Sequence, residues 1–185
     1  MFIQTEATPN PATLKFLPGK PVLPGGTRDY HDAEEAAESP LAQRLFSVSG
    51  VAGVFLGQDF ITVTKSNAEW QHMKPAILGL IMDHYLSGAP VLLASSGGEV
   101  AAEEFFDAAD GEIVTTIKQL LDTRVRPAVA QDGGDSTFHG FKEGVVFLNM
   151  KGSCAGCPSS TATLKHGIEN LLRHFVPEVS EVRAV

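Results

Sequence analysis

Apolar and polar residues alternate in short runs through the first half of the chain. This alternation predicts strands around residues 2–6, 13–17, 51–56 and 60–64. Gly57-Gln58-Asp59 has the turn composition that joins the last two runs as a hairpin. The Gly- and Pro-rich stretch 19–32 is typical of a loop.

Two helices are predicted in the same half. Ser39-Pro40 is typical of a helix start and predicts a short helix over 41–46, because proline is tolerated in the first turn. Ser66-Asn67-Ala68-Glu69 fits a capping box, which predicts a second helix that begins there and keeps an apolar face as far as Leu86. Pro75 is expected to kink or split this helix.

The second half has a different order of elements. Asp110 is expected to cap a helix with an apolar face up to Val125, and Pro127 to stop it. A hairpin over 136–150 follows, then a helix from Pro158 to Phe175 and a last strand within 179–185. The predicted order is α-β-β-α-β, in which helices pack on one face of a small mixed sheet.

A change in composition divides the chain. Residues 89–109 are rich in small and acidic residues, which is typical of a linker, although Phe105 and Phe106 could dock onto a domain. The predicted organisation is therefore a domain over 1–88, an acidic linker over 89–109 and a second domain over 110–185. The predicted fold class is α/β (α+β), with two small domains that each consist of a small mixed sheet and the helices packed on it.

Composition and charge exclude several classes of protein. The 185 residues carry a net charge of −8 and show no basic stripe, which argues against binding to nucleic acid. No apolar run approaches the ~20 residues of a membrane span. Because the N-terminus resembles no targeting segment, we expect a cytoplasmic protein, or one of the mitochondrial matrix if a presequence was removed.

The two cysteines of the chain lie together in Cys154-Ala155-Gly156-Cys157, directly before Pro158. Proline at the first helical position makes Cys157 the expected N-cap, and the helix dipole would then favour thiolates. Glycine-flanked C-x-x-C at a helix entrance is poorly explained as two buried apolar side chains. Two thiolates also fill only half of a four-coordinate zinc or iron–sulfur site.

Three functions fit this cysteine pair, and the spacing alone does not separate them. The pair could be a dithiol–disulfide redox centre, although such a centre is usually preceded by a βαβ unit and not by a hairpin. Alternatively, two chains could share one zinc ion or one iron–sulfur cluster.

Other polar residues give weaker signals. Asp132-Gly133-Gly134-Asp135 is first of all a turn, and carboxylates suit harder ions than an iron–sulfur cluster. The six histidines are scattered, with His166 at most a neighbour of the cysteines. No hydrolase triad, phosphate-binding loop or acid–base carboxylate pair is recognised, so we expect a protein that is not an enzyme.

Four stretches of the sequence resemble a known family. Residues 125–135 and 151–160 resemble the C-terminal NifU-like domain, in which an R-P segment leads to a D-G-G-D turn, a hairpin and C-x-x-C-P-x-S. Residues 8–19 and 70–85 resemble the N-terminal domain of Nfu-type iron–sulfur carriers. Full-length NifU has further cysteine-bearing and ferredoxin-like domains, which this chain lacks.

The resemblance implies a function. Cys154 and Cys157 would bind a [4Fe–4S] cluster bridged between the two chains of a homodimer. The chain would receive the cluster from upstream assembly proteins and transfer it to apo-proteins. The N-terminal domain has no cysteine, so docking of a client or partner is the role expected for it. A dithiol–disulfide oxidoreductase that uses the same pair remains the leading alternative, ahead of a zinc-bridged dimer.

Overall fold

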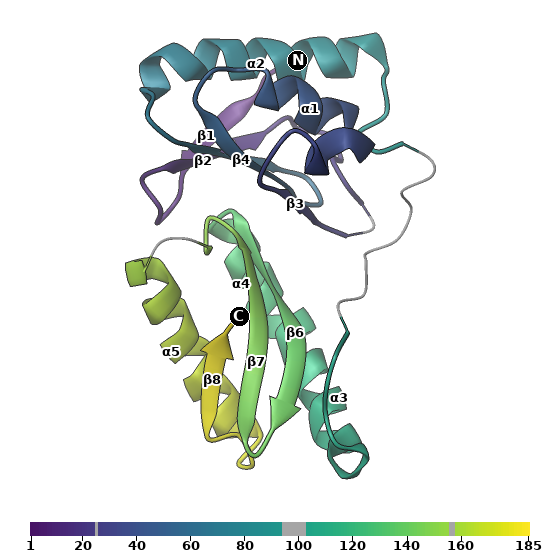
Figure 1. The fold of residues 1–185 in the computed structure, drawn as a ribbon, viewed down its shortest axis with the longest axis vertical. Coiled ribbons are helices and arrows are strands. Elements are labelled where there is room, and N and C mark those ends of the chain that lie inside the picture. Colours follow the sequence, from purple (N-terminus) through teal and green to yellow (C-terminus); the bar gives the residue numbers. More distant parts are fainter. Residues whose placement is uncertain (25, 94–102, 156–157) are drawn as a thin grey trace. The chain divides into compact units, whose positions relative to one another are not determined.

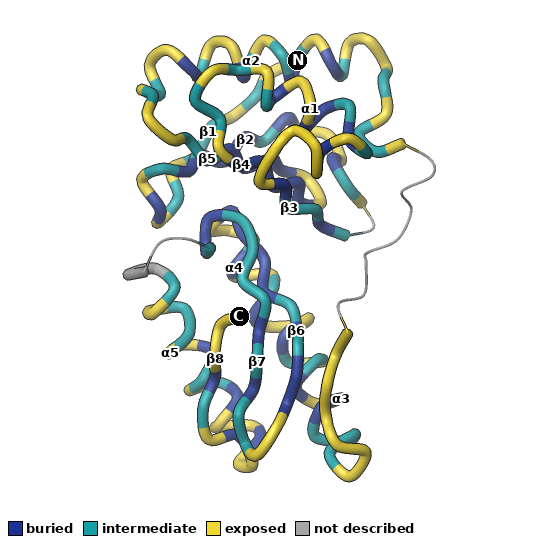
Figure 2. The backbone as a smooth tube through the Cα atoms, in the orientation of Figure 1, coloured by how far each residue is buried: buried dark blue, intermediate teal, exposed yellow. Residues whose placement is uncertain are grey.

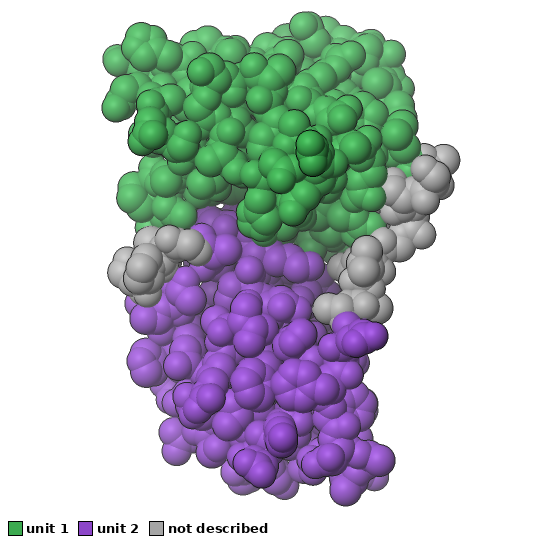
Figure 3. Space-filling view, viewed as in Figure 1, with its two compact units in different colours: residues 1–99 green, residues 100–185 purple. Residues whose placement is uncertain are grey.

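The chain folds as two compact units, residues 1–99 and 100–185 (Figures 1 and 3). The computed structural model describes residues 1–24, 26–93, 103–155 and 158–185, with backbone alone at 158–160. Residues 94–102 of the expected linker therefore lie outside the described residues. The predicted domain limits, 1–88 and 110–185, remain a proposal.

The first unit is a five-stranded sheet with two helices on one face (Figure 1). The strand order is β1-β2-β5-β4-β3, and every neighbouring pair is antiparallel. Its elements are β1 (Gln4–Ala7), β2 (Thr13–Leu17), β3 (Arg28–Tyr30), the 3-10 helix η1 (Glu35–Glu38), α1 (Pro40–Phe46), β4 (Val51–Leu56), β5 (Ile61–Lys65) and α2 (Trp70–Ser87).

The core of this unit lies between the sheet and the two helices (Figure 2). Alternation along β2 places Phe16 in this core, whereas its neighbour Lys15 lies 4.8 Å from the ring centroid of Phe60. Ser39 caps α1 as predicted, because its hydroxyl accepts the N–H of Ala42 at 3.1 Å.

The structure differs from three expectations for this unit. The second helix begins at Trp70 and not at Ser66, because the Ser66 N–H donates to the Gly50 carbonyl at 2.8 Å and continues the pairing beyond β5. Pro75 does not split the helix, which is continuous from Trp70 to Ser87. The stretch expected to be a loop also contains a strand, β3, which pairs with β4 at the sheet edge.

The second unit has the predicted order of elements. Its three-stranded sheet has the order β6-β7-β8, with β6 and β7 antiparallel and β7 and β8 parallel. The mixed sheet is therefore confirmed here, whereas the sheet of the first unit is wholly antiparallel. The elements are the 3-10 helix η3 (Ala108–Asp110), α3 (Gly111–Leu120), the π-helical segment η4 (Leu121–Val125), α4 (Arg126–Gln131), β6 (Gly134–Lys142), β7 (Val145–Gly152), α5 (Pro158–Phe175) and β8 (Glu181–Ala184).

Pro127 does not end the first helical stretch of this unit. The chain remains helical through a π-helical turn at 121–125, and α4 continues to Gln131 with Pro127 as its second residue. A proline is tolerated here because α4 starts again after the π-helical turn. The first N–H groups of a new helical start have no partner within the helix, so the N–H that proline lacks costs no hydrogen bond.

Phe105 attaches the end of the expected linker to the second unit. Its N–H donates to the His139 carbonyl at 3.2 Å, and its carbonyl accepts the Phe141 N–H at 2.9 Å. Its ring lies on Gly140, where a Cβ would come within 2.4 Å of ring atoms. The expectation that this phenylalanine could dock is confirmed.

None of the helices among the described residues is long and apolar enough to cross a bilayer.

A fully buried histidine, His84, lies near the end of α2. His84 has no exposed surface, and neither ring nitrogen has a hydrogen-bond partner among the described residues. Burial, and then the positive charge of Arg44, lower the pKa of His84; the backbone at Ala89 and Pro90 opposes the shift in part. The imidazole is therefore neutral in the folded protein at neutral pH.

This histidine should make the first unit sensitive to acid. Unfolded histidine titrates near pH 6.5, so a lowered folded pKa gives stability that is present above that pH and lost as the pH falls below it. We expect urea unfolding, followed by fluorescence of the lone Trp70, to show a loss of up to about 1.4 kcal/mol per pH unit that His84→Leu reduces. His166→Gln, at an exposed position, is the matched control. An unchanged slope in the His84 variant would contradict this assignment.

Candidate functional site

The cysteine pair lies between the end of β7 and the start of α5. Cys154 is described and is only 5% exposed. Cys157, predicted to be the N-cap of α5, lies outside the described residues. The strand-to-helix junction expected for the motif is therefore present, and Cys154 is placed on the inner side of the loop, against the core of the second unit.

The loop that carries Cys154 is bound to the Asp-Gly-Gly-Asp turn. The Ser153 hydroxyl donates to the Asp132 carbonyl, and the Ser153 N–H donates to the Gly133 carbonyl at 3.3 Å. On the other side, the Thr161 hydroxyl of α5 donates to the Cys154 carbonyl at 2.6 Å. The turn, about twenty residues earlier in the sequence, and the start of α5 thus hold Cys154 in place.

Glycine is needed at the two positions of this turn, 133 and 134, for different physical reasons. Gly133 has φ +80°, a left-handed conformation that side chains rarely adopt. Gly134 is needed for space, because a Cβ there would lie 2.6 Å from the Lys151 carbonyl oxygen and 2.8 Å from Cys154 Sγ. The sequence analysis treated this motif as a turn; its close contact with the cysteine is what that analysis missed.

A bidentate ion pair between Arg126 and Asp135 holds the turn in place. Arg126 Nε and Nη2 donate to the two carboxylate oxygens of Asp135 at 2.9 and 2.8 Å. The Asp135 side chain is 4% exposed, and it also accepts the Ser136 N–H at 2.8 Å. The hydrogen bond to Asp135 raises the pKa of Arg126 further, so the guanidinium stays charged at every pH at which the protein folds. The R-P and D-G-G-D motifs are thus one structural unit.

Burial changes the expected state of Cys154. The pKa of its thiol is raised to about 11, chiefly by loss of hydration; the Ser153 hydrogen bond lowers it, and the carboxylates of Asp132 and Asp135 add to the rise. For Cys154 the expected thiolate was therefore wrong, because the helix start lies beyond it whereas two carboxylates lie beside it. A metal that binds this sulfur must displace its proton.

No complete metal site exists within the part of the chain that the structure describes. Among those residues, no three His, Cys, Asp or Glu side chains come together as a metal-binding group. Asp135 is engaged with Arg126, and His166 is exposed on α5. The soft sulfur of Cys154 is of the kind that iron–sulfur clusters and zinc prefer.

A methyl group at Gly134 should disturb this arrangement. We expect Gly134→Ala to destabilise the second unit by about 1–3 kcal/mol, the usual cost of overpacking, because a backbone carbonyl blocks the new Cβ. Gly167→Ala on α5, where a Cβ meets nothing within 4 Å, should instead be neutral or stabilising. Thermal unfolding of both variants measures this difference, and equal stability of the two would show that the contact carries no cost.

Two family models match the chain, one in each unit. Residues 3–88 match the model of the Nfu/NifU scaffold protein N-terminal domain, and residues 117–183 match that of the NifU-like domain. A solution structure of a NifU-like protein from Saccharomyces cerevisiae has a TM-score of 0.46, with 29% identity over 51% of this chain and 86% of that one.

Two curated relatives resemble the chain along almost its whole length. The human protein named "NFU1 iron-sulfur cluster scaffold homolog, mitochondrial" is 51% identical over 100% of this chain and 72% of its own length. "NifU-like protein 4, mitochondrial" of Arabidopsis thaliana is 50% identical over 98% of this chain and 65% of its own. At this identity and coverage, with both domain models matched in order, the chain belongs to the Nfu/NifU family of scaffold proteins.

Proposed function

We propose that this chain is an iron–sulfur cluster scaffold and carrier, and that it is not an enzyme. Two chains hold a [4Fe–4S] cluster between them through Cys154 and Cys157 of each, and they pass it to apo-proteins. The observation that carries the proposal is the ligand count. One chain offers two thiols at a single loop, and a cluster needs four.

The mechanism that we propose is ligand exchange at iron. A client thiol loses its proton as its sulfur bonds to iron, and the displaced Cys154 or Cys157 thiolate takes up a proton. No electron is transferred. The high pKa of Cys154 in the cluster-free chain favours this release, because the free sulfur is most stable as a buried thiol.

Two separate observations weaken the two alternatives, the oxidoreductase and the zinc-bridged dimer. A dithiol–disulfide oxidoreductase needs a reactive thiolate, and a buried thiol with a raised pKa is a poor nucleophile. A shared zinc ion would use the same four sulfurs, but the human relative that covers this chain is named for an iron–sulfur cluster.

Partners and compartment follow from the same reading. The proposed partners are a second copy when the cluster is bound, upstream assembly proteins and apo client proteins. Of the two compartments expected, the names of the relatives favour the mitochondrial matrix, and nothing in the comparisons supports the cytoplasm.

Anaerobic reconstitution with iron and sulfide tests the cluster directly. We expect a brown dimer with about four iron atoms per two chains, and a Mössbauer spectrum that distinguishes [4Fe–4S] from [2Fe–2S]. Cys154→Ala and Cys157→Ala should each abolish stable binding, because each leaves only two thiolates per dimer. Ala162→Ser, exposed on α5, is the control that should bind normally.

Three outcomes would refute the proposal. A Cys157→Ala protein that binds and transfers a complete cluster would rule out the ligand set. A colourless protein with stoichiometric zinc would favour the zinc-bridged dimer. Efficient reduction of insulin disulfides would favour the oxidoreductase.

A further inference from the structure

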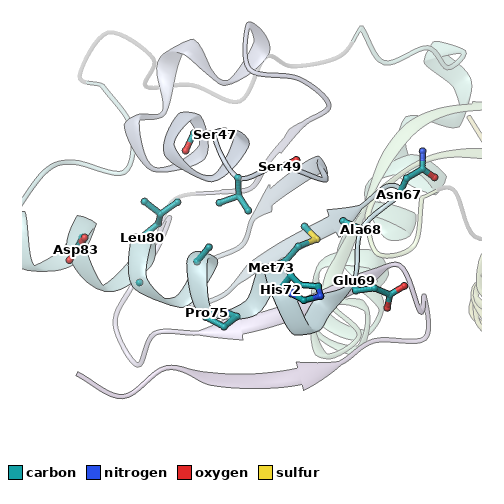
Figure 4. A pocket seen from close by; sticks show the side chains of 13 residues that line it. Ser47, Ser49, Asn67, Ala68, Glu69, His72, Met73, Pro75, Leu80 and Asp83 are labelled. Atoms are coloured by element: carbon teal, nitrogen blue, oxygen red, sulfur yellow. The ribbon is translucent and has the colours of Figure 1, made fainter.

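An open groove runs along α2 in the first unit, which has no cysteine. It has a volume of about 880 Å³ and lies between α2 and the loop that joins α1 to β4. Figure 4 shows Ser47 and Ser49 on that loop, across from Pro75 and Leu80 on the helix. Nothing in the proposed cluster chemistry uses this surface.

The groove has an apolar floor. Val48, Ala68, Met73, Ala76 and Leu80 line it, and Gly79 leaves a gap in the wall. A Cβ added at Gly79 would meet nothing within 4 Å, so the helix surface is open at this point. A glycine inside a helix lowers the stability of the helix by up to about 1 kcal/mol relative to alanine, and Gly79 is not required by close packing within the unit.

The rim of the groove is acidic. Glu69 and Asp83 line it near opposite ends, and no lysine or arginine is among its lining residues (Figure 4). Residues 1–99 as a whole carry six Lys and Arg against ten Asp and Glu. The complementary partner is therefore positively charged.

The walls of the groove also indicate the form of the partner. One wall is a helix, whose backbone groups are already bonded, and in the opposite loop the N–H groups of Ser47 and Val48 donate to Arg44 and Leu45. An extended peptide would find few backbone partners there, whereas a helix satisfies its own. Glu69 and Asp83 are fourteen residues apart on α2, or about 21 Å, which equals about four turns of a docked helix.

We propose that this groove binds a basic amphipathic helix of a protein that delivers the cluster to this chain or receives it. The apolar face of that helix covers Ala76, Gly79 and Leu80, and cationic side chains near its two ends meet Glu69 and Asp83. This inference rests on the proposed carrier function only for the identity of the partner. The surface itself exists in the cluster-free chain.

The test uses the cluster-free, full-length chain and a defined probe. The probe is a fluorescent, synthetic 18-residue helix with Leu and Ala on one face and two lysines fourteen positions apart; a second peptide carries glutamates at those positions. By fluorescence polarisation, we expect the lysine peptide to bind at least about fivefold more tightly, with a difference that shrinks as salt is raised.

Three variants locate the binding. Glu69→Gln and Asp83→Asn should each weaken the lysine peptide about two- to fivefold, as rim ion pairs do. Gly79→Leu should weaken both peptides at least about tenfold by filling the groove, while the helix keeps or gains thermal stability. Gly167→Leu is the matched control, because it is also a helical glycine with open space around it, in the other unit.

Equal binding of the two peptides, or an unchanged affinity in Gly79→Leu, would overturn the proposal. So would a dimer of the cluster-free chain that Gly79→Leu dissociates in sedimentation, since the groove would then belong to a second copy. Cluster reconstitution separates the groove hypothesis from the carrier hypothesis. A Gly79→Leu protein that loses peptide binding but has a normal cluster content supports the groove. A wild-type protein that fails to take up a cluster bears on the carrier function alone.

Discussion

The ion pair between Arg126 and Asp135 is the contact on which the candidate site depends. It joins the start of α4 to the first residues of β6, and so determines where the Asp132–Asp135 turn lies. The turn in turn binds the loop of Cys154 through Ser153. Without Arg126, the Asp135 carboxylate would be left buried and uncompensated, which costs far more than the intact pair contributes.

This arrangement gives Cys154 two opposed properties. Its sulfur is held at a defined place, as a cluster ligand must be, but the same contacts bury it and keep it protonated in the cluster-free chain. In the proposed dimer, cluster binding has to displace a proton and expose the sulfur to a second chain. Both costs lower the affinity for the cluster, and a carrier that must release its cargo benefits from such a lowering. A resident cofactor would more usually have four ligands from one chain.

The sequence predicted the elements where local signals were strong. The α-β-β-α-β order, the hairpins and the cap at Ser39 follow from periodicity and turn chemistry, and the structure has them. Two of the failures have a common cause, because each involves a partner distant in sequence. Ser66 bonds to Gly50 and so does not cap α2, and β3 is a strand because β4 offers it an edge.

The site shows the same limit. Spacing identified the cysteine pair, but it could not show that Gly134 lies against Cys154 or that two carboxylates oppose its ionisation. The charges of Arg126 and Asp135, nine residues apart, could have suggested an ion pair, although only the fold shows that their geometry is bidentate. Resemblance to a family supplied the function that these local patterns left open.

Two residues of the expected linker, Leu93 and Phe105, are hydrogen-bonded to the first and the second unit respectively. The Leu93 N–H donates to the Glu38 carbonyl in the first unit, and Phe105 is paired with β6 in the second. Twelve peptide units separate these two residues, so the chain between them cannot span more than about 40 Å. A client helix held on the first unit would be tethered to the second unit by this segment, and a tether raises the effective concentration of a bound client above that of a free one. Weak binding in the groove is then sufficient, and it leaves the client free to depart once it holds the cluster.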